Sequence, residues 1–116
     1  MTVRVLVGEP YPEIRVLLAH IVAGIGFEPV LYGDGDPELL DDIDVFLLEP
    51  ALPGGLEVAR KLRAQNPGLP IVFVSIYPPT EETSALSPLA YLMKPFALAE
   101  LQRTLNEAAA RASVSV

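Results

Sequence analysis

Short runs of apolar residues alternate along the chain with longer stretches in which apolar residues recur every three or four positions. The runs are rich in Val, Ile, Leu and Phe, so both faces of a strand built from them are apolar. They cover residues 3–7, 27–32, 44–48, 70–75 and 89–93. Strands of this kind are typical of a parallel sheet with helices on both faces, which is the α/β fold class that we predict.

The stretch after the first strand predicts an amphipathic helix with recognisable ends. Apolar residues stand at positions 14, 17, 18, 21, 22 and 25 and form one wide stripe. Pro12 suits the first turn of a helix, where its missing N–H would have no partner. Gly24 and Gly26 are typical of a helix end.

Three further helices are predicted, at 36–40, around 56–63 and at 98–108. On the middle one, Arg60, Lys61 and Arg63 are expected to form a solvated face. Residues 112–116 are expected to be a frayed tail, which leaves one domain at 1–111.

The connection from Pro78 to Pro88 differs from the others because it holds three prolines. A proline ring lacks an N–H donor and clashes with the preceding turn of a helix. At most two or three helical turns fit here. We therefore expect this connection to be the least regular part of the fold.

Composition and charge narrow the function. The chain has 116 residues, 51% of them hydrophobic, and a net charge of −7. The acidic balance argues against a nucleic-acid partner, and no apolar run reaches the roughly 18 residues of a membrane span. With no cysteine and one histidine, thiolate and histidine-rich metal centres are excluded. The start of the chain lacks a signal-peptide layout, so we expect a cytoplasmic protein.

Four polar residues follow strands of the predicted sheet. Glu9 comes after the first strand, Glu49 after the third, Ser75 ends the fourth and Lys94 follows the fifth. The carboxyl ends of parallel strands meet at one edge of a sheet, where ligands bind at the reversal of strand order. Two carboxylates, a hydroxyl and an ammonium are therefore expected to converge.

These residues and the motifs around them resemble the receiver domain of two-component response regulators over essentially the whole chain. The motifs include Val3-Arg4-Val5-Leu6-Val7, Asp44-Val45-Phe46-Leu47-Leu48, Leu52-Pro53-Gly54, Pro70-Ile71-Val72-Phe73-Val74-Ser75 and Tyr91-Leu92-Met93-Lys94-Pro95-Phe96. The resemblance implies a flavodoxin-like, doubly wound sheet of five parallel strands in the order 2-1-3-4-5. Its fourth helix would be short or irregular in this chain.

The chain departs from that family at the positions that carry its chemistry. The resemblance implies an acidic pair that holds Mg²⁺ after the first strand, and here that pair reads Glu9-Pro10. It also implies a phosphoryl-accepting aspartate after the third strand, and here that position is Glu49. The extra methylene moves the carboxylate roughly 1.5 Å outward, into the space of a phosphoryl group. We expect weak or absent Mg²⁺ binding, with Glu9 and Glu49 as residual ligands at best, and no other cofactor.

A degenerate pocket is therefore predicted around Glu49, formed by Glu9, Pro10, Ser75 and Lys94. We expect Glu49 to pair with Lys94 at a partly solvated sheet edge and to accept a hydrogen bond from the Ser75 hydroxyl. The Lys94-Pro95 peptide is a candidate for a cis bond.

Each of these residues also has an ordinary interpretation. Glu9 and Glu49 are both compatible with solvated acids at strand ends, and Ser75 with a turn residue. By resemblance, Tyr91 stands at the family's switch aromatic, but it is equally compatible with a half-buried tyrosine.

Three functions stay open on these grounds. The first is a stand-alone degenerate receiver that is not an enzyme and binds a signalling partner, such as a histidine kinase or an output protein. The second is a working receiver that accepts a phosphoryl group on Glu49. The third is a flavodoxin-like protein that binds a small ligand, although the two prolines of the segment 8–12 lack N–H donors for an anion.

Overall fold

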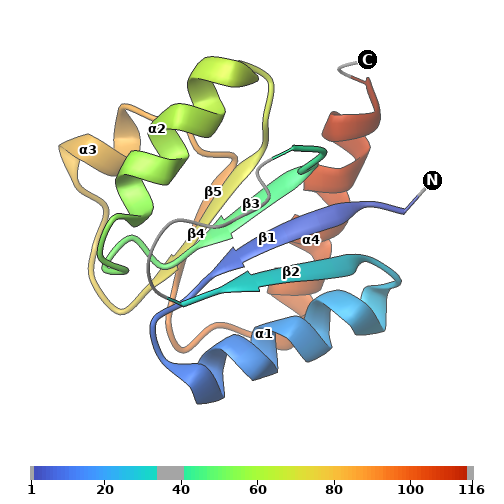
Figure 1. Cartoon of the computed structure of the whole chain (residues 1–116). Coiled ribbons are helices and arrows are strands. Elements are labelled where there is room, and N and C mark those ends of the chain that lie inside the picture. Colours follow the sequence, from blue (N-terminus) through green and yellow to red (C-terminus); the bar gives the residue numbers. More distant parts are fainter. Residues whose placement is uncertain (1, 34–40, 115–116) are drawn as a thin grey trace.

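Five parallel strands form one sheet in the order β2-β1-β3-β4-β5, as predicted (Figure 1). The computed structural model describes residues 2–33 and 41–114. The strands are β1 (Arg4–Gly8), β2 (Glu28–Tyr32), β3 (Val45–Leu48), β4 (Ile71–Ser75) and β5 (Ala90–Met93). In the pairing of β1 with β3, Gly8 stands opposite Leu48. The residues that follow these two strands therefore start from neighbouring positions.

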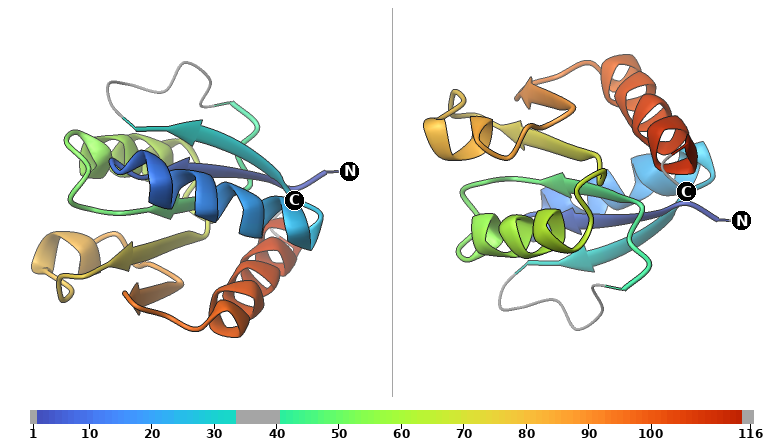
Figure 2. Two further views of the ribbon diagram at one scale, coloured as in Figure 1. Left: turned by 90° about the horizontal axis from the view of Figure 1, so that it is seen from below. Right: turned by 90° about the horizontal axis from the view of Figure 1, so that it is seen from above.

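Helices cover both faces of the sheet, so it is doubly wound (Figures 1 and 2). The described helices are α1 (Pro12–Ile25), α2 (Gly55–Gln65), α3 (Glu81–Ser84) and α4 (Leu98–Val114). Alternate residues of a strand point to opposite faces. On β3, Val45 and Leu47 belong to the core with α1 and α4. Phe46 and Leu48 of the same strand belong to the core with α2.

Two predicted elements at the margins need comment. The helix predicted at 36–40 lies outside the described residues. The expected tail begins at 112, but α4 continues to Val114. Residues 112–114 are therefore helical, in keeping with the alanine-rich turn that precedes them. The boundary of the domain at 111 stays a prediction, and residues 115–116 lie outside the description.

The connection between β4 and β5 holds only the single turn of α3, as its prolines predict. Thr80 and Thr83 cap this turn: the Thr80 side chain accepts from the Thr83 N–H at 3.2 Å, and the Thr83 side chain accepts from the Thr80 N–H at 2.9 Å. Such reciprocal capping stabilises a helix too short to hold itself.

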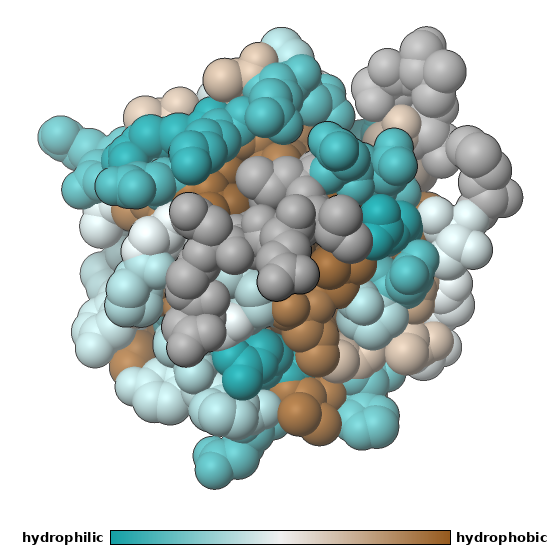
Figure 3. All heavy atoms as spheres, viewed as in Figure 1, coloured by the Kyte–Doolittle hydropathy of each residue, from teal (hydrophilic) through white to brown (hydrophobic). Residues whose placement is uncertain are grey.

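Arg63 does not belong to the solvated face that its sequence position predicts. Figure 3 shows hydrophilic side chains gathered over α2, and Arg60 and Lys61 are exposed. The Arg63 guanidinium instead donates to the carbonyl of Leu69 at 2.6 Å and to that of Leu86 at 2.9 and 3.1 Å. Burial lowers the pKa of Arg63 below its ordinary value. The side chain joins the segments that lead into β4 and β5.

No helix within residues 2–33 and 41–114 combines the length and the apolar character that crossing a bilayer requires.

Candidate functional site

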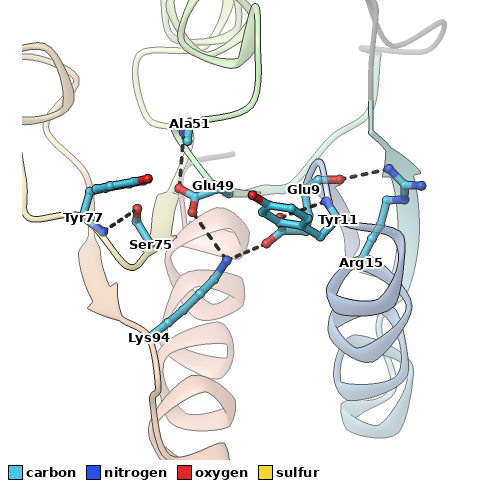
Figure 4. Close-up of polar contacts among 8 residues, drawn as sticks. All are labelled: Glu9, Tyr11, Arg15, Glu49, Ala51, Ser75, Tyr77 and Lys94. Atoms are coloured by element: carbon cyan, nitrogen blue, oxygen red, sulfur yellow. Dashed lines mark hydrogen bonds and ion pairs between the residues drawn. The ribbon is translucent and has the colours of Figure 1, made fainter.

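Three of the predicted site residues converge where the strands end (Figure 4). The Glu49 N–H donates to the Gly8 carbonyl at 2.9 Å, which ties the residue after β3 to the end of β1. The Lys94 N–H donates to the Ser75 carbonyl at 2.8 Å, which ties the residue after β5 to the end of β4. These backbone bonds fix where the three charged side chains begin.

Gly8 allows this edge of the sheet to close tightly. A Cβ atom at this position would lie 2.8 Å from Leu48 Cδ1 and 2.8 Å from Tyr32 Cε1. Contacts this short would force the Leu48 or Tyr32 side chain to move, so glycine fits between them without a shift. The close packing brings the residues after β1 and β3 next to each other.

Lys94 pairs most closely with Glu9, whereas the sequence predicts Glu49 as its partner. The ammonium Nζ lies 2.7 Å from Glu9 Oε1 and 3.5 Å from Glu49 Oε1. Because the two carboxylates stand on neighbouring strands, one ammonium serves both. Glu9 is fully buried and its carboxylate cannot be hydrated from the solvent, so the shorter of the two ion pairs with Lys94 is the one to Glu9.

The three side chains are more buried than a solvated sheet edge implies. The exposed fractions are 0% for the Glu9 side chain, 4% for that of Glu49 and 13% for that of Lys94. The interpretation of both glutamates as solvated acids is therefore wrong. Two carboxylates and one ammonium leave the cluster with a formal charge of −1. Removing one partner from a buried ion pair is strongly destabilising, because it leaves a charge without compensation.

The second oxygen of each carboxylate accepts from a nearby backbone N–H. Glu9 Oε2 accepts from the Tyr11 N–H at 3.3 Å, and Glu49 Oε2 accepts from the Ala51 N–H at 3.3 Å. Both bonds are long for a charged acceptor, which usually draws a donor to about 2.7–2.9 Å. The Glu49 carboxylate in particular makes no polar contact shorter than 3.3 Å among the described residues.

Ser75 does not donate to Glu49 in the described part of the chain. Its hydroxyl accepts from the Tyr77 N–H at 3.1 Å, two residues further along. This is the turn geometry that serine favours at the end of a strand. The alternative interpretation of Ser75 as a turn residue is therefore the better one.

The residues at the family's metal position do not fit Mg²⁺. This ion takes oxygen ligands in near-octahedral geometry at about 2.0–2.1 Å. Pro10 brings no ligand, and the ammonium of Lys94 already lies beside both remaining carboxylates. Among residues 2–33 and 41–114, no group of three or more His, Cys, Asp or Glu could hold a metal ion.

Tyr91 is held by its ring and by its hydroxyl. The ring packs on Phe73 with 5.7 Å between centroids and an interplanar angle of 48°. The hydroxyl donates to the Tyr77 carbonyl at 2.7 Å, so it ties β5 to the loop after β4. The role of Tyr91 as a switch stays a prediction. The Lys94-Pro95 peptide is cis, as predicted.

Sequence reasoning missed several residues around this site. Arg15 of α1 donates to the Glu9 carbonyl at 2.9 Å and holds the turn after β1. Tyr11, Ile76 and Tyr77 line a pocket together with Glu49 and Lys94. The available signal was the position of these apolar residues directly after the strand-end motifs, where a solvated loop favours polar residues.

Known proteins share both the sequence and the fold. The DNA-binding response regulator MtrA of Mycolicibacterium smegmatis is 36% identical over 110 residues, which cover 87% of this chain and 48% of that protein. A receiver domain protein from Methanospirillum hungatei has a TM-score of 0.85 at 21% identity, with each chain covered completely. The chain is a response regulator receiver domain.

Two further known proteins are similar to this receiver domain, one in sequence and one in fold. The probable transcriptional regulatory protein TcrX of Mycobacterium tuberculosis is 29% identical over 122 residues, which cover 97% of this chain and 52% of that protein. The response regulator TrrA of Thermotoga maritima, solved with Mg²⁺ and BeF, has a TM-score of 0.79 at 26% identity, covering 92% of this chain and 99% of that one.

The receiver domain spans about half the length of the curated relatives that it matches. No family model matches it. These relatives are named as a response regulator and a transcriptional regulatory protein, and the fold of this domain is that of CheY-like receivers.

Proposed function

We propose that this receiver domain is degenerate: it takes part in two-component signalling by binding a protein partner and is not phosphorylated in the ordinary way. The observation that carries the proposal is the ammonium of Lys94, which lies 2.7 Å from Glu9 and 3.5 Å from Glu49. Every charged side chain of the cluster is thereby engaged within the protein.

The first reason to expect weak phosphoryl transfer is that Pro10 replaces an acidic residue. Transfer needs a cation that neutralises the phosphoryl oxygens and a nucleophile held in line with the donor. Pro10 stands where the family has the second acid of its metal-binding pair. The Glu9 carboxylate that remains is committed to Lys94. A Mg²⁺ ion would have to displace a buried ion pair and would find one acid fewer.

The second reason to expect weak phosphoryl transfer is the length of the Glu49 side chain at the acceptor position. The Glu49 carboxylate reaches roughly 1.5 Å beyond an aspartate, so it lies in the space that a phosphoryl group would occupy. There it places negative charge beside Lys94 without modification. A carboxylate imitates the sign of a phosphoryl group but has fewer oxygens and less charge. The cluster therefore favours one fixed state of the site over a switch.

The partner is a signalling protein, such as a histidine kinase or an output protein. Two relatives are named as a DNA-binding response regulator and a transcriptional regulatory protein. This chain matches only about half of each. Its own net charge of −7 favours contact with a protein over contact with DNA.

The proposal is tested with a radiolabelled phosphodonor. The wild-type domain is incubated with labelled acetyl phosphate and Mg²⁺, beside Glu49→Asp and the double variant Pro10→Asp/Glu49→Asp. We expect no label on the wild type or the single variant and some label on the double variant, which regains both acids. Label on Glu49 of the wild type would contradict the proposal and support a working glutamyl acceptor instead.

A further inference from the structure

A pocket of about 460 Å³ opens beside the acidic cluster, at the edge where the strands end. Its apolar walls include Tyr11 and Ile14 at the start of α1 and Ile76 and Tyr77 in the loop after β4. Glu49 and Lys94 line it as well, and the rings of Tyr11 and Tyr77 lie on either side of Glu49 (Figure 4). Small-molecule pockets are of this size and combine apolar walls with a few polar groups.

The rim of this pocket is unusually apolar for a surface. Tyr11 is 62% exposed, Ile76 61% and Tyr77 58%. Single exposed apolar side chains are common, but three around one opening mark a surface that is covered when a ligand is present. Because these three side chains are more than half exposed, most of their apolar surface does not contribute to the stability of the free domain.

Glu49 has spare capacity to accept hydrogen bonds. Its side chain is only 4% exposed. Its described contacts are the ammonium at 3.5 Å and the Ala51 N–H at 3.3 Å. A carboxylate has about four lone-pair positions and forms its strong bonds at about 2.7–2.9 Å. A donor that enters from the pocket would meet an acceptor that is buried but weakly satisfied.

Charge selects the kind of donor. Glu9, Glu49 and Lys94 together carry −1, so a ligand with one positive charge makes the cluster neutral. An anion in the pocket would meet the Glu49 carboxylate, and the Lys94 ammonium that lines the same pocket is already paired with the buried Glu9 at 2.7 Å. The net charge of −7 on the chain also attracts cations.

We infer that this pocket binds an organic cation, in which an ammonium or guanidinium group on an apolar stem donates to Glu49. The stem lies between Tyr11, Ile76 and Tyr77, and the tyrosine faces attract the cation. The inference rests on the proposed function, because a phosphoryl group on Glu49 would fill the same space. The cation belongs either to a free amine or to a basic side chain of the protein partner.

Three ligands of one shape test the inference: phenethylamine, 2-phenylethanol and 3-phenylpropionate. Each is titrated into the ¹⁵N-labelled domain, and the amide signals of Ala51, Tyr11 and Tyr77 are followed by NMR. We expect the amine to bind about tenfold more tightly than the alcohol, and the acid to bind least. Equal binding of the three, or no saturable shift of these amides, would overturn the inference.

Two variants with a matched control show where the amine binds. Glu49→Gln should lose the preference for the amine over the alcohol. Ile76→Ser should weaken both ligands, whereas Leu17→Ser, which changes a residue 56% exposed on α1 outside the pocket, should weaken neither. Equal effects of the two serine variants would place the amine elsewhere and overturn the inference. This pair decides the matter even where Glu49→Gln fails to fold.

A dipeptide of phenylalanine and lysine, blocked at both ends, distinguishes the two sources of the cation. Binding as tight as that of phenethylamine supports a basic side chain of the partner. Binding of the free amine alone supports a small molecule. Failure of the inference is separable from failure of the proposed function, because the first is measured by the ratio of amine to alcohol binding and the second by label on Glu49.

Discussion

Two cations are held at opposite ends of the sheet in different surroundings. Lys94 follows the carboxyl end of β5 and lies between the carboxylates of Glu9 and Glu49. Arg63 lies beside the segments that lead into β4 and β5 and donates only to backbone carbonyls, those of Pro67, Leu69, Leu86 and Ser87. Within residues 2–33 and 41–114 it forms no ion pair.

The difference separates a buried cluster of charges from a structural anchor. The carboxylates at Lys94 are formal charges with almost no access to water, so their free energy depends on the ammonium. The carbonyls at Arg63 are dipoles, and several of them lie near the surface, where water can replace a lost donor. The Lys94 arrangement places charged residues at the strand ends. The Arg63 arrangement holds the connection between β4 and β5, whose prolines allow only one helical turn.

The largest effect is expected from Lys94→Met. The substitution leaves Glu9 and Glu49 buried as adjacent like charges, so we expect the free energy of unfolding to fall by about 3–5 kcal/mol. Urea unfolding measures this loss. Lys61→Met, which changes an exposed lysine on α2, is the control and should have no effect. A loss of less than about 1 kcal/mol, as for an exposed pair, would show that the charged cluster does not stabilise the fold.

Arg63→Met should cost less, about 2–3 kcal/mol, because several carbonyls lose their donor but some regain water. Hydrogen exchange should speed up for the amides from Leu86 to Leu89 before it does so in β1. Arg60→Met is the matched control, since its 2.8 Å pair with Glu82 is half exposed. Such a pair contributes about 1 kcal/mol or less. Equal losses in the two variants would remove the anchor role of Arg63.

Comparing Glu9→Gln with Glu49→Gln sharpens the account of the lysine site. The 2.7 Å bond to Glu9 is the stronger one, so we expect its loss to lower the free energy of unfolding by about 1–2 kcal/mol more than the loss of Glu49. Both variants keep the size of the side chain. Urea unfolding in parallel gives the difference, and a larger loss for Glu49→Gln would reverse the order of the two partners.

The smallest effect concerns the loop between the two regions. Tyr91→Phe removes the 2.7 Å bond to the Tyr77 carbonyl but keeps the ring on Phe73. We expect the free energy of unfolding to fall by about 1 kcal/mol, and NMR signals of the loop after β4 to broaden. Tyr11→Phe is the control. Unchanged loop signals in Tyr91→Phe would show that the hydroxyl does not order this loop.

The sequence predicted the fold well because the information lies in local patterns. Five apolar runs and the spacing between them define the strands, and the order of the strands was predicted from the resemblance to receiver domains. The single turn of α3 follows from its prolines. The continuation of α4 to Val114 was missed because residues 112–114 contain no glycine or proline that would mark where the helix ends. Helix-forming residues simply extend the last turn.

The sequence predicted which charged residues lie together at the sheet edge better than it predicted which of them pair most closely. Strand-end positions located Glu9, Glu49 and Lys94 correctly, since register places them together. Which carboxylate takes the shorter bond depends on burial, and burial is a property of tertiary packing that no local pattern contains. For the same reason the sequence around Arg63, a charged residue beside two others on an amphipathic helix, did not indicate that its guanidinium donates to backbone carbonyls.

The central claim, that the broken acidic pair and the commitment of the remaining acids to Lys94 deprive the site of its metal, is tested most directly by titrating Mg²⁺. The amide signals of Tyr11 and Ala51, which donate to the two carboxylates, are followed by NMR in the wild type and in Pro10→Asp/Glu49→Asp. We predict no saturable shift of either amide in the wild type up to millimolar Mg²⁺, and a saturable shift in the double variant. Tight, stoichiometric binding that shifts both amides of the wild type would contradict the account.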